Sequence, residues 1–562
     1  MSQHWLDRYA SGFHAWQDTN SNGRRVFRRR IGVVESAFHT DGTDYEGRAD
    51  VNAFLILDAR STLSAESLRE RVLLAWASLR LQHALLLAKV ECQASGDCFV
   101  IEPPVDYPEA LATAGNQLVF IDDHYLDADA EDFYRHALNT GRVLDAEHSL
   151  SRLFILPPRF SENKTDQFQA ILIAAHEITD GLAMYNWQQH FMRLLNASNG
   201  DLQTSIEQNR LPERLWACLP PAQEDLYPPV AGNVARQRWY WAIVRILRHV
   251  RKPLPQGLTN PLRRDQRYDT ATEMPPNYAA ILNYSPNRKP PLNTFFVGLT
   301  LPQTASHRLQ QLVRDANASV GAGCFALVGL AMMELYEKQH PSVPLADRKP
   351  FVAAFPLNPR PFFGYNGPAD SCMLAFSDGI VMPFLSSSLP VEGRFRLLAK
   401  IAHRQLRIYQ KRLRDPELNL GMSSHNPARM IATNYIAAVE RAETKLPPER
   451  RTGMNPQGAY PATYNFGSAT CGVSSVGSVK DLLSPGMFDL SKEPENGLVA
   501  DYRSLRSVVR ARDNEFLVGS AGDNTGIHFF VSYDGNAVPE EKAQEWKAKM
   551  EVLLEPGERS RL

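Results

Sequence analysis

The chain has 562 residues, more than one hydrophobic core usually supports, so we expect two large lobes. Hydrophobic residues make up 44% and charged residues 22%, which is ordinary for a globular protein, and the formal net charge is -1. This balance argues against nucleic acid or an anionic membrane as the main partner.

Neither a membrane span nor a leader sequence is expected. The chain has no run of about 18 apolar residues, and the start "MSQHWLDRYASGFHAWQ" lacks a basic region followed by an apolar one. No Cys-x-x-Cys pair occurs, which favours a reduced, cytoplasmic protein, although Cys92 and Cys98 are close enough in sequence to form a disulfide. The other cysteines are Cys218, Cys324, Cys372 and Cys471.

The first part of the chain alternates strands and helices. Residues 49–59 have strand composition, and 64–86 form a helix that begins at a Ser cap. Residues 151–158 and 168–175 are predicted buried strands. After His176, apolar residues at helical spacing predict a further helix.

A proline-rich region at 216–290 follows and is predicted to bridge two lobes. It contains a basic amphipathic helix at 236–252. Its predicted apolar face is Trp239, Ile243, Ile246, Leu247 and Val250, and its arginines Arg238, Arg245, Arg248 and Arg251 fall largely on the other face. Such a helix either binds a membrane or a calmodulin-like partner, or packs against a lobe as a linker; we favour the linker.

The last part repeats the order of the first. A strand begins near residue 293 and is followed by a capped helix, a Gly-rich turn and an apolar helix; strand-like runs at 350–365 and 379–386 precede a helix at 388–413. The chain closes with a strand at 527–535 and a helix at 539–554. We therefore predict two similar α/β lobes, 1–215 and 291–562, joined by the bridge.

The stretch "ILIAAHEITDGLAMYNW" (171–187) carries the strongest chemical signal. A buried strand ends at His176, and Asp180 and Gly181 precede an amphipathic helix. An imidazole can take a proton from an alcohol and return it to a leaving group. Gly181 permits a positive φ or a close backbone approach. The alternative is that Asp180 only caps the helix and His176 is a packed strand-end residue.

His176, Asp180 and Gly181 together form an HxxxDG motif, which resembles that of the CoA-dependent acyltransferase superfamily. Chloramphenicol acetyltransferase, plant BAHD acyltransferases and peptide-synthetase condensation domains belong to this superfamily. The opening strand and helix, "FPLNPRPF" (355–362) and "IHFFVSYDGNAVPEE" (527–541) are similar to further family segments in the right order. Among its branches, the fungal trichothecene 15-O-acetyltransferase-like group is similar in length.

The resemblance implies two chloramphenicol-acetyltransferase-like lobes that form a pseudo-dimer around a central channel. It implies that His176 is the general base and that Asp180 is structural, with Arg360 as its partner and Asn358 holding the same loop. Ser474, Ser475 or nearby backbone N–H groups are its candidates for stabilising the oxyanion.

Two departures from the family pattern matter. Ala175 replaces the first histidine of the double histidine of condensation domains, which favours a CoA donor over a carrier-protein donor. The plant-type DFGWG signature is absent, and "YNFGSATCGVSSVGSVKDLL" (464–483) stands in its place. Its "VSSVG" is similar to the segment with which related proteins cross over at the active site.

The sequence therefore predicts a cytoplasmic, monomeric O-acyltransferase that moves an acyl group, most simply acetyl, from acyl-CoA to a hydroxyl of a fungal secondary metabolite such as a terpenoid mycotoxin. No bound cofactor or metal is expected, because metal-binding and Walker-type motifs are absent. Peripheral membrane contact stays open. The alternatives are a carrier-protein donor, amide formation, a fold repurposed for polyketide cyclisation, and a non-catalytic binding module.

Overall fold

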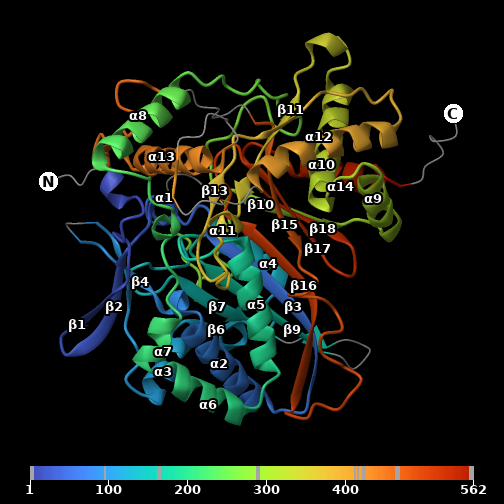
Figure 1. Ribbon diagram of the computed structural model, residues 1–562. Coiled ribbons are helices and arrows are strands. Elements are labelled where there is room, and N and C mark those ends of the chain that lie inside the picture. Colours follow the sequence, from blue (N-terminus) through green and yellow to red (C-terminus); the bar gives the residue numbers. More distant parts are fainter. Residues whose placement is uncertain are drawn as a thin grey trace.

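The computed structural model describes residues 5–93, 96–157, 159–160, 166–285, 292–410, 413, 417–419, 426–462 and 469–555. Residues 464–468 of the segment that replaces DFGWG, and 286–290 at the end of the predicted bridge, lie outside this part. The described chain forms two α/β lobes, and Figure 1 shows one below the other.

The N-terminal lobe is built on a six-stranded sheet whose strands follow the order β16-β3-β9-β7-β6, with β8 paired to β9. These strands are β3 (Val51–Ser61), β6 (Leu118–Phe120), β7 (Ser151–Ile155), β8 (Arg159–Phe160), β9 (Asp166–Ala174) and β16 (Leu498–Val509). Its helices are α2 (Ala65–Gln82), α3 (Tyr107–Gly115), α4 (Ala130–Asn139), α5 (Gly181–Leu195), α6 (Asn199–Asn209) and α7 (Pro212–Ala217). A small sheet at its edge has the order β1-β2-β5-β4 and comprises β1 (Gln17–Ser21), β2 (Arg24–Arg30), β4 (Lys89–Glu91) and β5 (Cys98–Ile101).

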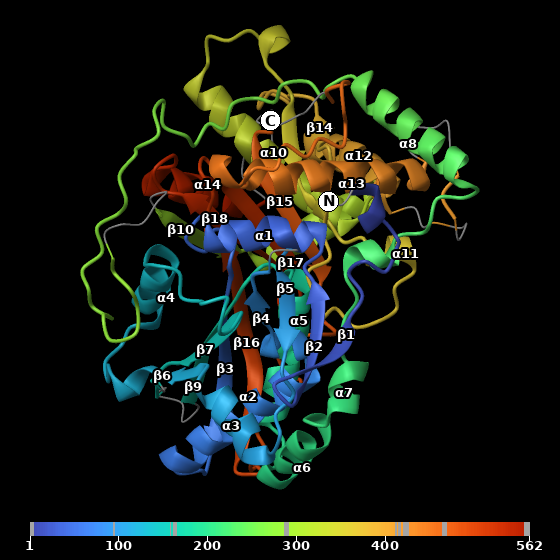
Figure 2. The same cartoon turned by 90° about the vertical axis from the view of Figure 1, so that its left-hand side faces the viewer.

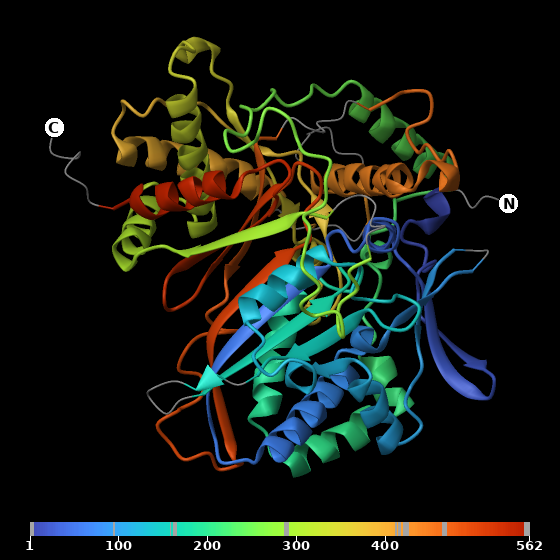
Figure 3. The same cartoon turned by 180° about the vertical axis from the view of Figure 1, so that it is seen from behind.

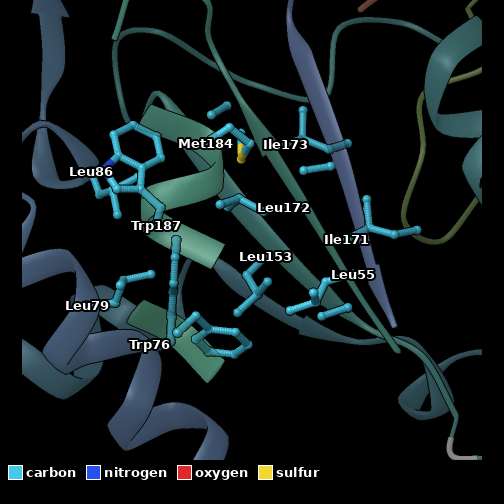
Figure 4. Packing of buried hydrophobic residues seen from close by; sticks show 14 of the residues in the cluster. Leu55, Trp76, Leu79, Leu86, Leu153, Ile171, Leu172, Ile173, Met184 and Trp187 are labelled. Atoms are coloured by element: carbon cyan, nitrogen blue, oxygen red, sulfur yellow. The ribbon is translucent and has the colours of Figure 1, made fainter. Parts of the chain in front are cut away.

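The core of this lobe forms where α2 and α5 pack on the sheet. Trp76 of α2 and Trp187 of α5 are fully buried and lie against Leu153 and Leu172 of the sheet (Figure 4). Ser64 caps α2 by accepting the Ser67 N–H at 3.1 Å, as its position before the apolar repeat predicts. This packing fixes β9 and α5, the two elements that flank the HxxxDG turn.

The C-terminal lobe has a second six-stranded sheet in the order β10-β18-β17-β15-β11-β14. These strands are β10 (Thr294–Thr300), β11 (Phe351–Ala354), β14 (Ile380–Met382), β15 (Cys471–Ser478), β17 (Phe516–Gly522) and β18 (Ile527–Asp534). Its helices are α9 (Gln303–Asp315), α10 (Val320–Gln339), α12 (Val391–Tyr409) and α14 (Glu540–Val552). Helix α10 is the one described helix long and apolar enough to cross a membrane, but 72% of its apolar window is buried, and it lies in the core of this lobe.

One strand of the C-terminal half belongs to the sheet of the N-terminal lobe. β16 leaves the C-terminal lobe between β15 and β17 and pairs antiparallel with β3, from Leu498 opposite Ser61 to Val509 opposite Val51. Figure 3 shows this long strand beside β3. A division of the chain at residue 291 therefore misses this exchange, and the segment "VSSVG" is not the crossing strand, because β15 stays in the C-terminal sheet.

A layer of helices covers the junction of the lobes on one side. It contains α1 (Val33–Thr43), α8 (Val234–His249), α13 (Pro427–Lys445) and the short helix Trp5–Arg8. In Figure 2, α1 and α13 lie side by side above the N-terminal sheet, in agreement with their contacts.

The predicted apolar face of α8 is wrong. Trp239 and Val250 are more than 60% exposed, while Tyr240, Trp241 and Val244 are buried. Both faces of this helix carry large apolar side chains, and packing against α13 decides between them. Arg248 is buried as well, because Glu440 and Gln457 satisfy its guanidinium at 2.7 Å each. The helix is thus packed against its neighbours, as the linker interpretation expects.

All six cysteines are unpaired, so Cys92 and Cys98 do not form the disulfide that their spacing permits.

Candidate active site

His176 lies in the turn between β9 and α5, at the junction of the two lobes. Its ring stacks on Phe38 of α1, with 3.9 Å between the ring centroids and an angle of 9° between the planes. The next residue makes a second contact between the turn and α1, because Glu177 Oε1 lies 3.1 Å from Nδ1 of His39. Two consecutive residues of α1 thus hold two consecutive residues of the turn.

The Glu177–His39 contact is buried. Burial alone would lower the pKa of His39, but Glu177 and Asp97 raise it above its ordinary value. The pair therefore fixes α1, and with it Phe38, against the turn. Sequence reasoning missed this contact, because 138 positions separate the two residues and neither belongs to a pattern.

His176 lines a cavity of about 310 Å³ between the lobes. The walls come from both lobes and from the crossing strand β16, and most of them are apolar. Examples are Phe38, Val51 and Tyr185 from the N-terminal lobe and Phe355, Leu374 and Phe530 from the C-terminal lobe. A small, mainly apolar chamber of this kind suits the reacting part of an organic substrate.

The environment of His176 keeps its imidazole neutral. Burial lowers its pKa to about 4; Arg512 nearby contributes in the same direction, while its own backbone, Asp180 and the backbone of Thr179 oppose the shift. Nδ1 is buried without a hydrogen-bond partner in the described chain. At neutral pH the ring is therefore an unprotonated base at the wall of the cavity.

Asp180 is 1% exposed and does not line the cavity. One carboxylate oxygen accepts the Ala183 N–H at 2.9 Å and so caps α5. The other accepts the Met373 N–H at 3.1 Å and pairs with Arg360 at 2.9 Å. Helix capping and the expected ion pair are both present, and they tie the turn to the C-terminal lobe.

Arg360 begins the short helix α11 (Arg360–Phe363) and is 5% exposed. Besides Asp180, its guanidinium donates to the Ser371 carbonyl at 2.6 Å. Asn358 Oδ1 accepts from the backbone N–H of Arg360 at 3.1 Å and from its guanidinium at 3.4 Å. The structure thus brings Asp180, Arg360 and Asn358 together, and none of them lines the cavity.

Gly181 is the first residue of α5 and lines the cavity. Its φ is not in the left-handed region, so of the two roles considered for this glycine, a positive φ and a close backbone approach, the first is not used. A Cβ at this position would lie 3.5 Å from Val476 Cγ2, an ordinary contact. The absence of a side chain therefore leaves room in the cavity beside His176 and does not relieve the turn.

The two candidate serines point to opposite sides of β15. Ser474 lines the cavity, whereas Ser475 is exposed and does not line it. This alternation follows from the two-residue repeat of a strand, and it leaves the side chain of Ser475 outside the cavity. Ser507, Ser520 and Ser532 also line the cavity and were missed, because their strands meet only in the folded chain.

No group of three or more His, Cys, Asp or Glu side chains that could hold a metal ion occurs in the described ranges.

No protein-family model and no curated protein sequence matches the chain. Among solved structures, the chain is similar to trichothecene 15-O-acetyltransferase from Fusarium sporotrichioides, with 13% identity, a TM-score of 0.65 and 97% of each chain covered. It is also similar to the condensation domain of the monacolin K polyketide synthase, with 10% identity, a TM-score of 0.51, and 94% of this chain and 96% of that one covered. The first condensation domain of the calcium-dependent antibiotic synthetase is 10% identical with a TM-score of 0.51, over 95% of this chain and 97% of that one.

At these identities the likeness shows the fold alone. The chain has the two-lobed α/β fold that these acetyltransferase and condensation-domain structures share, so the predicted fold class is confirmed.

Proposed function

We propose that the protein is an acyltransferase that moves an acyl group from a thioester to a hydroxyl group at His176. The observation that supports this most strongly is a neutral imidazole at the wall of an interlobe cavity, held by Phe38 on its face. A general base must be unprotonated and within reach of its substrate, and the lowered pKa of His176 and its position at the cavity wall support this role.

The reaction needs only this chain's residues and two substrates. His176 takes the proton of the acceptor hydroxyl as its oxygen attacks the thioester carbonyl carbon. The tetrahedral intermediate then collapses, the carbon–sulfur bond breaks, and the imidazolium returns the proton to the leaving thiolate. Ser474 is our candidate donor to the oxyanion, because its side chain lies on the cavity side of β15.

We propose acyl-CoA, most simply acetyl-CoA, as the donor and a hydroxylated secondary metabolite as the acceptor. Ala175 before His176 supports a CoA donor, as the family pattern implies. The alternative donor is a thioester on a carrier protein, which the fold shared with condensation domains supports.

Release of free thiol tests this proposal. The purified protein is incubated with acetyl-CoA, or with the acetyl thioester of N-acetylcysteamine as a carrier-arm mimic, and a panel of terpenoid and polyketide alcohols. His176→Ala should lower acceptor-dependent release by about 10²–10⁴-fold. His148→Ala is the matched control, because this histidine is exposed and its partner, Asp145, is exposed as well.

Acceptor-dependent release that persists undiminished in His176→Ala would contradict the role of His176. Release from the mimic but not from acetyl-CoA would replace the CoA donor by a carrier protein.

A further inference from the structure

Three cations lie together at one side of the cavity. Arg441 and Lys445 are one helical turn apart on α13, and Arg512 follows β16. Arg441 and Arg512 line the cavity itself. Phe38 links this group to the base, since its ring stacks on His176 and lies 5.3 Å from Lys445 Nζ and 5.9 Å from the guanidinium carbon of Arg512.

Two of the three cations have acid partners. Asp41 forms ion pairs with both Lys445 and Arg512, at 2.7 Å for Arg512, and Glu515 lies 3.6 Å from Arg512. Asp41 holds this position despite its burial, because both cations lower its pKa. Within the described residues, this cluster thus contains three basic side chains and two acidic ones.

Arg441 is the cation without a partner. Its guanidinium makes no ion pair or hydrogen bond with any described residue, and it lies 3.7 Å over the ring of Phe376. Burial and repulsion from Arg512 lower its pKa to about 10 while Asp41 opposes the shift, so it remains charged at neutral pH. Arg441 is partly exposed at the cavity wall and has no ion-pair partner among the described residues, and stacking on an aromatic ring offsets only part of the cost of its partial desolvation.

We propose that Arg441 binds an acidic group, a carboxylate or a phosphate, on the substrate that reacts at His176. A guanidinium suits such a group because its planar donors match two acceptor oxygens, and the cavity wall beside it would hold the apolar body of the same molecule. The enzyme then selects acidic substrates.

The acidic group belongs to the reacting part of a substrate. The long pantetheine arm of coenzyme A separates its sulfur from its diphosphate, whereas Phe38 alone separates His176 from Arg512, the neighbour of Arg441. Phosphates of a donor whose thioester lies at His176 would thus lie beyond this cluster. Two sources remain: a carboxylate or phosphate on the acceptor, and a carboxylate at the far end of the acyl chain.

This inference rests on the proposed function, because it takes the bound molecule to be the substrate of the acyl transfer. Its test measures binding alone and does not require the reaction to occur. Calorimetry would compare 12-hydroxydodecanoate with its methyl ester, and malonyl-CoA with acetyl-CoA. We expect wild type to bind the acidic member of at least one pair about 10-fold more tightly. Arg441→Gln should abolish this preference and Arg441→Lys should retain part of it.

Two controls make the result specific. Arg404→Gln removes an exposed arginine of α12 and should leave the preference unchanged. His176→Ala should also keep it, so that binding is separated from catalysis. A preference in the first pair assigns the acidic group to the acceptor, and one in the second pair assigns it to the acyl chain.

If neither pair shows a preference that depends on Arg441, in protein whose melting temperature matches wild type, the proposal is overturned. If the preference is present and no acyl transfer occurs with any donor, the acid site stands and the proposed function fails.

Discussion

Arg360 and Arg441 both lie at the boundary between the lobes, and they differ in what surrounds their charge. Arg360 pairs with Asp180 and also donates to the Ser371 carbonyl and to Asn358. Arg441 faces the cavity with an aromatic ring beneath it and has no acid partner in the described chain. An arginine that is paired with an acid within the chain stabilises the fold, whereas one without such a partner can bind an acidic ligand. Substitutions should therefore affect stability at the first arginine and binding at the second.

Asp180→Ala should have the largest effect on stability. The change leaves Arg360 buried and unpaired and removes both the cap of α5 and the acceptor for the Met373 N–H. We expect the free energy of unfolding to fall by about 3–5 kcal/mol in urea denaturation followed by tryptophan fluorescence. Asp106→Ala, which removes the exposed cap of α3 alone, should cost only about 1 kcal/mol.

The double variant Asp180→Ala/Arg360→Met shows whether the unpaired charge causes the loss. It should be more stable than Asp180→Ala, because no buried charge remains without a partner. If the losses of Asp180→Ala and Arg360→Met simply add in the double variant, the two residues are not coupled and this explanation is contradicted.

Arg360→Lys should have an intermediate effect. A lysine keeps the charge but cannot reach Asp180, Ser371 and Asn358 together, so we expect a loss of about 1.5–3 kcal/mol in the same denaturation experiment. Arg441→Lys is the matched change at the other arginine and should unfold like wild type. Equal losses at both sites would remove the distinction between them.

Arg441→Met should have the smallest effect on stability. The change removes stacking on Phe376 and also removes repulsion from Arg512, so the free energy of unfolding should stay within about 1 kcal/mol of wild type. A loss as large as that of Asp180→Ala would mean that Arg441 holds the fold and that no ligand need be sought there.

The sequence supports prediction of this site where the signal is local. The strand, turn and helix around His176 follow from hydrophobic periodicity and a cap, and all three lie within a few residues. The Asp180–Arg360 contact came from resemblance to a family, since 180 positions separate the residues. Neither a local pattern nor the family resemblance predicts the cavity wall, because Phe38, Arg441 and Arg512 come from three distant segments.

Two errors have physical causes that periodicity cannot detect. The predicted division at residue 291 places β16 in the C-terminal lobe, yet this strand pairs with β3 in the sheet of the N-terminal lobe. On α8 both faces are apolar enough to be buried. Arg248 can be buried because Glu440 of α13 pairs with its charge. Each outcome depends on a partner from elsewhere in the chain.

The most direct test of the central claim is the protonation of His176 itself. Protein with ¹³C-labelled histidine is titrated by NMR, and His176→Ala assigns the resonance. Burial should keep the folded ring neutral down to a midpoint near pH 4, below the ordinary value of 6.5. Because the unfolded chain takes up this proton first, the stability contributed by the neutral ring should decline as pH falls from 6.5 toward 4. A midpoint near 6.5 or above would show an imidazole open to water or paired with an acid, and would contradict a desolvated base in the interlobe cavity.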